Sequence, residues 1–444
     1  MIGTYEQWRE GRDDHSIVSI AYSSQFYDVC RRLGTRAHVV AAHAWRPGVN
    51  DAQFTLRHRP IPFKTTGSAL YFAGQVLYAV DLMARAVAFR AQVVVVSTGL
   101  LYFLLAPLGL LGMKLVPSLH CAFWPMGFRP RSGAQKLVQW LNGWFWNRMV
   151  SATICVSPEC EHQVRQVAGR VRGRIFQVRA QYRQGLLDTV SSPPAHGCTP
   201  FGIMYAGRVE RNKGVFGLLD LAERLERSRP GRFVWDICGS GSALADLQDA
   251  VRARRLEQVF RLRGKLDHDQ MAESYGAAHV VVVPTTREFA EGLNKVAVEA
   301  VLAGRPLVTS RLSNALDVLG EAAVEVPPDD IDAYERAIVR LADDSELYEQ
   351  KCAACRPVQA QFYDQGRAWG TALEEILTEV QRKAFPSNAG RSNDGLGSEG
   401  QVWGDSPQSR RDGGIKPRVS AASPGSQDGS MFWSPRRGRR KARV

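Results

Sequence analysis

Short β-branched runs alternate with helical patterns twice along the chain, and this alternation constrains the fold more than any other feature. The second series contains the runs FGIMYAG, FVWDICG, VFRLRG, HVVVVP and PLVTS, with helical patterns between them. Strands that alternate with helices predict a parallel sheet with helices on its faces. We therefore predict a Rossmann-like, doubly wound α/β domain over 201–366.

The first part of the chain shows a similar series. Strands are expected at 17–23, 37–43, 93–96, 153–157 and 174–178, and helices at 25–33, about 68–89 and about 134–149. The stretch 188–200 is rich in Pro, Ser and Gly, which suits a linker. We predict two facing Rossmann-like domains, 1–187 and 201–366, with a cleft between them where ligands of open α/β sheets bind, and a C-terminal helix over 367–383.

The end of the chain has a different composition. Residues 384–444 are rich in Gly, Ser and Pro and finish in the basic cluster RRGRRKARV. The part from 386 onward carries about +6 of the +13 net charge. Such a segment buries too little apolar surface to offset the entropy of ordering, so we predict a disordered basic tail that catalysis does not need.

Composition and cysteine content indicate a protein of a reducing compartment. Eight cysteines are too sparse for a disulfide framework, and the polar start MIGTYEQWREGRDDHS does not resemble a signal peptide. Residues 91–113 contain no charge and are long enough to span a bilayer, which leaves a transmembrane helix as an alternative. Ser97, Thr98 and Gly99 interrupt this stretch, which favours strand, helix and strand instead. We expect a cytoplasmic protein.

The segment 284–306, PTTREFAEGLNKVAVEAVLAGRP, is the most informative for chemistry. A strand ends in a polar loop, a helix starts near Asn294, Glu291 lies just before that helix and Glu299 lies on it. The free N–H groups and the partial positive charge of a helix start favour a phosphate. The two carboxylates could accept hydrogen bonds from the hydroxyls of a sugar–phosphate ligand. The alternative is a capping acid and a solvated helix residue.

Two further strand ends carry residues that suit a phosphate ligand. Arg208 follows Gly207 after the strand 201–206, and Lys213 precedes the next helix, so the two cations are a candidate diphosphate clamp. Gly239 and Gly241 stand at the following strand-to-helix turn, where bare backbone permits close approach of a ligand. Both features also occur at ordinary surface turns.

In order and spacing these clusters resemble the retaining GT-B glycosyltransferases of family 4. Glu291 and Glu299 match the E-x7-E motif of that family, Gly207-Arg208 and Lys213-Gly214 match its GR and KG positions, and CGSG matches its G-x-G turn. The stretch EGLNKVAVEAVLAGRPLVTS resembles the usual EGFG, EA and G-x-P-V-V pattern. The resemblance is strong over about 200–345 and looser over 17–180.

The resemblance implies roles for these residues. Arg208 and Lys213 would hold the diphosphate of a nucleoside diphosphate sugar, Glu299 the ribose and Glu291 the transferred sugar. His120, at the end of a first-domain strand, would face that sugar; a histidine merely satisfied at the cleft edge is the alternative. Fixed positive charges stabilise a departing diphosphate without a metal, so no metal and no separate cofactor are expected. The remaining donor-site positions are Gly207, Gly239, Gly241, Gly264, Lys265, Leu266, Gly292, Leu293 and Asn294.

The sequence also departs from the family. Its first strand is followed by AYSSQFYD in place of a glycine-rich loop, so Ser23, Ser24 and Gln25 would serve there. Asn294 and Lys295 replace the usual small or apolar residues. The details of sugar recognition and the acceptor therefore stay open.

The resemblance implies a cytoplasmic retaining glycosyltransferase that acts in polysaccharide biosynthesis on a lipid-linked or saccharide acceptor. The rivals are a nucleotide-sugar epimerase on the same scaffold and a non-catalytic, membrane-associated scaffold. Four tryptophans are interleaved with four cations between Trp124 and Arg148, which suits either core packing or peripheral binding to an anionic membrane surface at the inner face of the plasma membrane. Nucleic acid is not an expected partner.

Overall fold

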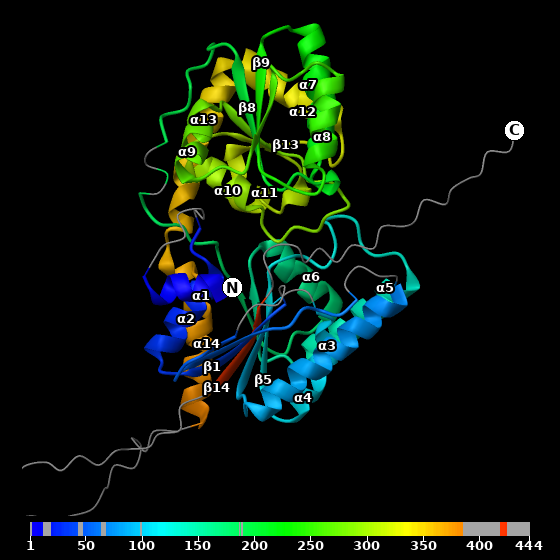
Figure 1. Ribbon diagram of the computed structural model, residues 1–444, viewed down its shortest axis with the longest axis vertical. Coiled ribbons are helices and arrows are strands. Elements are labelled where there is room, and N and C mark those ends of the chain that lie inside the picture. The colour runs from blue at the N-terminus through cyan, green and yellow to red at the C-terminus, as the bar shows by residue number, and fades with distance from the viewer. Residues whose placement is uncertain are drawn as a thin grey trace, which may run out of the picture.

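The computed structural model describes residues 2–11, 19–42, 48–63, 68–97, 100–185, 187, 190–384 and 418–423. Figure 1 shows two α/β domains, one above the other in this view. The chain passes from the first domain to the second before β8 (Phe201–Ala206) and returns through α14 (Trp369–Ala384). Because α14 packs against α2 (Tyr22–Arg32), the last described helix belongs to the first domain. The predicted α/β class is confirmed, with one sheet in each domain and parallel pairing throughout except between β2 and β3.

The sheet of the first domain has eight strands in the order β2-β3-β1-β14-β4-β5-β6-β7. All neighbouring strands are parallel except β2 and β3. The strands are β1 Arg36–Ala41, β2 Val49–Asn50, β3 Phe54–His58, β4 Val93–Ser97, β5 Lys114–Leu119, β6 Ala152–Cys155, β7 Arg174–Gln177 and β14 Arg418–Ser423.

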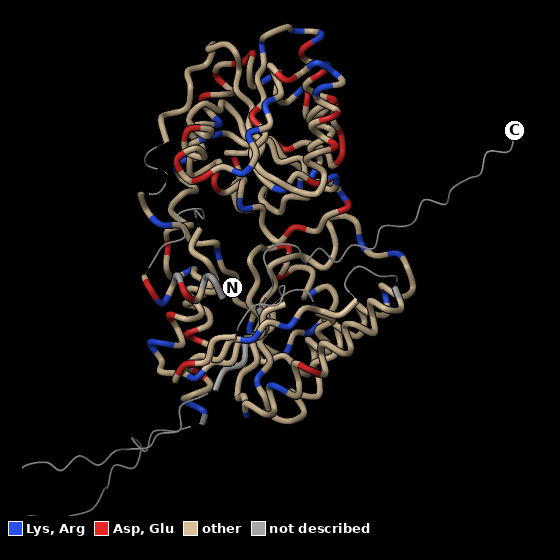
Figure 2. The backbone as a smooth tube through the Cα atoms, viewed as in Figure 1, with Lys and Arg blue, Asp and Glu red and all other residues tan. Residues whose placement is uncertain are grey.

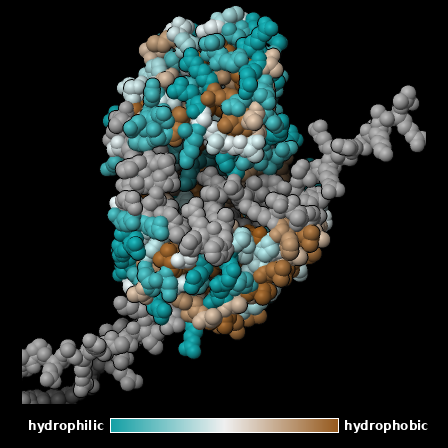
Figure 3. Space-filling model, in the orientation of Figure 1, coloured by the Kyte–Doolittle hydropathy of each residue, from teal (hydrophilic) through white to brown (hydrophobic). Residues whose placement is uncertain are grey.

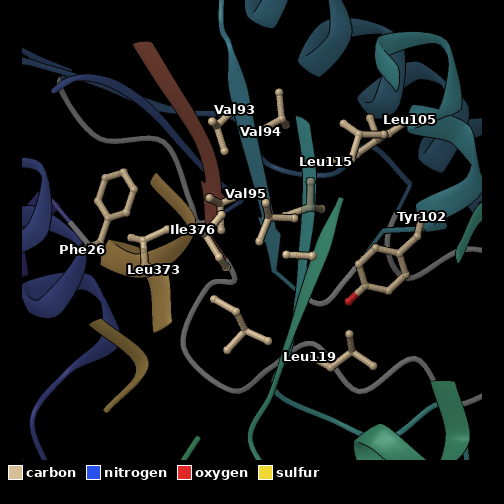
Figure 4. Packing of buried hydrophobic residues seen from close by; sticks show 14 of the residues in the cluster. Phe26, Val93, Val94, Val95, Tyr102, Leu105, Leu115, Leu119, Leu373 and Ile376 are labelled. Carbon is tan, nitrogen blue, oxygen red and sulfur yellow. The ribbon is translucent and has the colours of Figure 1, made fainter. Parts of the chain in front are cut away.

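Helices cover both faces of this sheet. Figure 1 places α1, α2 and α14 on the left of the sheet and α3, α4 and α5 on its right. The helices not yet bounded are α1 Ile2–Arg9, α3 Ser68–Ala88, α4 Ala106–Leu110, α5 Gly133–Arg148 and α6 Pro158–Ala168, with the short 3-10 helix η1 at Tyr102–Leu105. A strand covered on both faces is continuously apolar, which explains the buried run Val93–Val96 in β4. Figure 4 shows this strand between Leu373 of α14 and Leu105 of η1.

The central strand of the first sheet differs from the sequence expectation. The described part of the segment predicted as a strand at 17–23 forms only an isolated bridge from Ser19 to Tyr182, and α2 already begins at Tyr22. Residues 17 and 18 lie outside the described residues. The position between β1 and β4 is occupied by β14, in which Ala421 lies opposite Val39 on one side and Val95 on the other.

The six residues of β14, 418–423, form a strand where the sequence predicts a disordered tail. β14 is parallel to both of its neighbours, so its backbone pairs on both edges. The prediction that nothing after residue 383 takes part in the fold is therefore wrong for 418–423. Residues 385–417 and 424–444 lie outside the described residues.

The second domain contains a six-stranded, wholly parallel sheet in the order β10-β9-β8-β11-β12-β13. Its other strands are β9 Phe233–Cys238, β10 Phe260–Gly264, β11 Val280–Val283, β12 Leu307–Thr309 and β13 Ala323–Glu325. Its helices are α7 Val215–Ser228, α8 Leu244–Ala253, α9 His268–Ala277, α10 Lys295–Leu302, α11 Leu316–Leu319, α12 Ile331–Asp343 and α13 Ser345–Gln359. The predicted series of strands and helices over 201–343 is confirmed.

The apolar stretch 91–113 forms β4, η1 and α4, and β5 follows it. The predicted order of strand, helix and strand is therefore confirmed. Over the described part of the chain, no helix combines the length and the apolar character that crossing a bilayer requires.

Candidate functional site

Glycines bring the ends of neighbouring strands together in the second domain. Gly207 follows β8 and Gly239 follows β9, and both have φ of +145°, a conformation that favours glycine. A Cβ at Gly239 would lie 1.8 Å from the carbonyl oxygen of Gly207, and one at Gly241 would lie 2.3 Å from that of Val209. The Gly239 N–H also donates to the Gly264 carbonyl at 2.7 Å. The predicted positions around β8, β9 and β10 thus form one continuous backbone surface.

The start of α10 is built as the sequence predicts. Asn294 is the N-cap, and its side-chain oxygen accepts from the Ala297 N–H at 3.1 Å. The preceding loop is held by Asn314, whose Nδ2 donates to the Glu291 carbonyl at 2.8 Å. Glu291 therefore has a fixed position just before the positive end of the helix.

The two domains meet at Gly292. A Cβ at this residue would lie 1.9 Å from the carbonyl oxygen of His120, and the Ala122 N–H donates to the Glu291 carbonyl at 3.0 Å. Any side chain at position 292 would separate the domains here. The contact places His120, at the end of β5, beside the loop that carries Glu291.

The Glu291 carboxylate is paired with Lys213. The two side chains form an ion pair and are only 11% and 13% exposed, respectively. Asn294 Nδ2 donates to the same carboxylate oxygen at 3.2 Å, and Thr285 lies at 3.5 Å. Lys213 Nζ also lies 3.4 Å from the centre of the Phe289 ring.

Arg208 lies in the same cluster. Its guanidinium pairs with Glu210 at 3.1 Å and lies 5.6 Å from the Phe289 ring centre. The structure therefore brings the two predicted cations together around one aromatic ring. In this arrangement each cation is neutralised by a carboxylate, where the sequence suggested only a phosphate partner.

Glu299 lies one turn after Lys295 on α10, and both residues are half-buried. Tyr275 Oη donates to Glu299 Oε2 at 3.3 Å. Burial raises the pKa of Glu299 to about 7, although Lys295 and Tyr275 act in the opposite direction. Burial also lowers the pKa of Lys295. Glu299 is thus not the solvated helix residue of the alternative interpretation.

Lys295, which the sequence marked as a departure, connects the two domains. Its Nζ donates to Ser19 Oγ at 3.0 Å and lies 5.6 Å from the ring centre of Tyr22. Tyr22 in turn lies 4.6 Å from the ring of His120. A single cation therefore joins the helix of the E-x7-E segment to Ser19 and Tyr22 of the first domain.

His120 is held in its neutral form. Burial, with a smaller contribution from the Lys295 charge, lowers its pKa to about 3. Ser118 Oγ lies 3.1 Å from His120 Nε2 and accepts from Trp369 Nε1 at 2.8 Å. A Ser118 hydroxyl that donates to Nε2 leaves the ring proton on Nδ1. The imidazole can then orient a hydroxyl, but it does not carry a positive charge at neutral pH.

The predicted turn after the first strand is not a loop. Ser23, Ser24 and Gln25 lie in the first turn of α2. Gln25 is buried; its Oε1 accepts from the Gly370 N–H at 2.8 Å and its Nε2 donates to the Ile20 carbonyl at 3.3 Å. The expectation that Gln25 faces a ligand is wrong, because it joins α2 to α14.

The remaining predicted positions lie beside this cluster. Gly264 is the last residue of β10, next to the turn that carries Gly239, and Lys265 and Leu266 follow it. Leu293 lies between Gly292 and the N-cap of α10. Sequence reasoning missed Ser118, Tyr275, Phe289 and Trp369, which hold the predicted residues. Across the described residues, His, Cys, Asp and Glu side chains nowhere gather in threes as a metal site.

Comparison with known proteins identifies the second domain. Residues 200–344 match the family model described as Glycosyl transferases group 1. Over these residues the chain is similar to group 1 glycosyltransferases. Glycogen synthase of Mycobacterium tuberculosis is 31% identical to the chain over 185 residues, which are 41% of this chain and 44% of that protein. The chain thus aligns with less than half the length of this curated relative.

Solved structures extend the likeness of the group 1 domain to the whole fold. Sucrose-phosphate synthase of Thermosynechococcus elongatus covers 83% of this chain and 93% of its own, with a TM-score of 0.58 and 18% identity. The Anabaena protein HepE, solved in complex with UDP, covers 79% of this chain and all of its own, with a TM-score of 0.56 and 14% identity. The chain has the GT-B fold, with two facing Rossmann-like domains.

Proposed function

We propose that the protein is a glycosyltransferase that moves a sugar from a nucleoside diphosphate sugar to an acceptor. The observation that carries the proposal is the arrangement at the start of α10. Glu291, Lys213 and Arg208 lie together in the second domain, and the backbone of His120, from the first domain, contacts Gly292 beside them. The sugar-transferring relatives and the UDP in HepE support a UDP-sugar as the first donor to test.

The diphosphate would bind at the start of α10. Helix N–H groups that lack an intrahelical partner, the helix dipole, Lys213 and Arg208 all favour negative charge there. These groups would also stabilise the charge that develops on the departing diphosphate. Lys213 would exchange its Glu291 partner for a phosphate oxygen when the donor binds. That exchange would free the Glu291 carboxylate for hydroxyls of the transferred sugar.

The other groups would orient the donor. Glu299, one turn after Lys295, would accept hydrogen bonds from the ribose hydroxyls, and the backbone at Gly264, Lys265 and Leu266 would contact the base. His120 would orient a sugar hydroxyl as a neutral ring, because burial keeps its pKa low. We infer retention of the anomeric configuration from the family resemblance alone, and we assign no covalent nucleophile and no metal.

For the acceptor we propose a lipid-linked or saccharide precursor of a polysaccharide. The enzyme would then work in the cytoplasm as a peripheral protein at the inner face of the plasma membrane. The large apolar side chains exposed on the first domain support this location.

Calorimetric titration with UDP-, GDP-, ADP- and dTDP-sugars tests the donor, and NMR of the product tests the anomeric outcome. Saturable binding of one sugar nucleotide and its consumption only with an acceptor present would support transfer. Isomerisation of the sugar nucleotide without acceptor would instead show an epimerase. Failure to bind any sugar nucleotide would leave a non-catalytic scaffold.

A further inference from the structure

Large apolar side chains are exposed unevenly over the molecule. Within the described ranges, all exposed large hydrophobic residues belong to the first domain. Scattered single residues of this kind are ordinary, but a contiguous patch marks a site of interaction. They are Phe63, Leu70, Phe72, Val76, Leu77, Val80, Val87, Leu110, Leu111, Phe128, Leu137, Trp140 and Trp144.

The fully exposed residues of α3 between 69 and 88 are all apolar, and the charged residues Asp81 and Arg85 are half-buried and paired with each other. A helix that covers a sheet normally presents polar residues to water, so an apolar outer face is unusual. At 1.5 Å per residue, these twenty residues extend over about 30 Å. The exposed residues of this face are Ala69, Leu70, Phe72, Ala73, Val76, Leu77, Val80, Ala84, Val87 and Ala88.

The neighbouring helix α5 continues this surface. Lys136, Trp140, Trp144 and Arg148 are exposed and follow one another at intervals of four residues, so they form one stripe along the helix. Trp140 is 67% exposed and Trp144 is 41% exposed, although each is large enough to bury in a core. Both α3 and α5 pack on η1, and Figure 3 shows a brown band along the lower right edge, where Figure 1 places α3. We call these exposed residues of α3 and α5 the α3–α5 face.

The charge around the α3–α5 face has one sign. Between residues 52 and 158 the sequence contains ten Lys or Arg and a single acidic residue, Asp81. Asp81 is itself paired with Arg85 at 2.8 Å. Figure 2 shows both signs of charge over the second domain, and mostly uncharged tube along α3. An apolar surface in a basic segment fits a partner with both an apolar interior and negative charge.

An anionic bilayer has both properties, and a second copy of this chain does not. In a symmetric dimer the same basic patch would face itself, so like charges would repel. Tryptophan is enriched at the boundary between lipid and water, and each nearby cation strengthens binding to anionic lipid. We propose that the α3–α5 face docks the protein onto an anionic membrane surface, with α3 lying along the interface rather than spanning it.

This docking deepens the proposed function, since it would bring the cleft to lipid-linked acceptors, but its test does not need catalysis. Co-sedimentation with vesicles of phosphatidylcholine, with and without phosphatidylglycerol, measures it directly. The full chain should bind only the anionic vesicles, and high salt should weaken binding. Leu77→Gln with Val80→Gln removes exposed apolar surface without adding charge, and should weaken binding about tenfold or more. Ala353→Gln, on an exposed position of α13, is the matched control.

A second pair of variants tests the charge. Lys136→Glu with Arg148→Glu reverses two cations of the stripe and should weaken binding about tenfold or more. Arg252→Glu with Arg356→Glu makes the same change in net charge on the second domain and should have little effect. Donor binding should stay unchanged in all these variants, because none of the positions lies near Glu291 or Lys213. Retained donor binding with lost vesicle binding therefore separates the docking surface from the donor site.

Three results would overturn the docking proposal. Vesicle binding by Leu77→Gln with Val80→Gln at the level of the full chain would exclude the α3 face. Equal binding to neutral vesicles would exclude the role of charge. A dimer in analytical ultracentrifugation that the same two variants dissociate, without vesicle binding, would show that the face joins two copies. Vesicle binding without binding of any sugar nucleotide would uphold the docking surface and reject the transferase.

Discussion

Lys213 and Glu291 form an ion pair that links the loop after β8 to the loop before α10. Both side chains are nearly buried, so removal of either one would leave the other charge buried without this partner. A diphosphate at the start of α10 would compete with Glu291 for Lys213. Donor binding would therefore have to break this ion pair.

The first prediction is that Lys213→Ala weakens binding of the nucleoside diphosphate. A charge-assisted hydrogen bond is worth roughly 1.5 to 3 kcal/mol, so affinity should fall about ten- to a hundredfold. Glu291→Gln should instead leave nucleoside diphosphate affinity unchanged or raise it, because Lys213 loses a competing partner. Calorimetric titration with UDP measures both variants, and Arg252→Ala on α8 is the control. Equal losses in the Lys213 and Glu291 variants would contradict the exchange of partners.

The second prediction concerns the pH dependence of Glu299. Burial raises the pKa of Glu299 from its ordinary value of about 4.5 to about 7 in the folded protein. The folded state therefore binds the proton of this carboxyl group more tightly than the unfolded state. The resulting stabilisation is present at low pH and is lost as pH rises from about 4.5 to about 7. Glu299→Gln should flatten the fall in Tm over this range.

Ligand binding should change in the opposite direction. An ionised Glu299 accepts two hydrogen bonds from the ribose, whereas the protonated acid accepts fewer, so UDP affinity should rise from pH 6 to pH 8. Glu299→Gln should remove the part of this rise in affinity that the carboxylate causes. The part that remains comes from ionisation of the phosphate of UDP. Titrations at a series of pH values measure the difference. A parallel pH profile in the two proteins would contradict ribose recognition by Glu299.

The candidate site was predictable where it depends on local sequence. Strand ends, the N-cap at Asn294 and the E-x7-E spacing are all read within a few residues, and the structure places them at one edge of the second sheet. The need for glycine at 292 was not predictable in the same way. It comes from the His120 carbonyl, which belongs to a different domain.

Most of the contacts that could not be predicted join residues that lie far apart in the sequence. Trp369 reaches Ser118 from a helix 251 residues further along the chain, and Gln25 is used to hold Gly370. No spacing or periodicity relates such residues, because only the return of α14 to the first domain brings them together. The same reason explains why Gln25 was expected at a ligand and lies in the core.

The third prediction is that Trp369→Phe slows the reaction without weakening donor binding. The change keeps an aromatic ring but removes the N–H that donates to Ser118 Oγ, which in turn lies against His120 Nε2. His120 would lose part of its orientation, so kcat should fall several-fold while KM for the donor stays nearly constant. Tyr22→Phe, which keeps the ring beside His120, is the matched control. A rise in the donor KM with unchanged kcat would show that Trp369 acts on binding instead.

The last prediction tests β14, which occupies the centre of the first sheet although it lies in a segment whose composition suggested a tail. Its backbone pairs with β1 and β4, so its removal would leave two inner strand edges without partners. Even two or three lost ladder hydrogen bonds, at about 1 kcal/mol each, would lower Tm by roughly 5 °C in a domain of this size. A chain that ends at Ala384 should therefore melt lower than the full chain, whereas one that ends at Gly425 and retains β14 should melt like it. Scanning calorimetry of the three chains measures the effect. Identical melting of the two truncated chains would show that the first sheet does not need this strand.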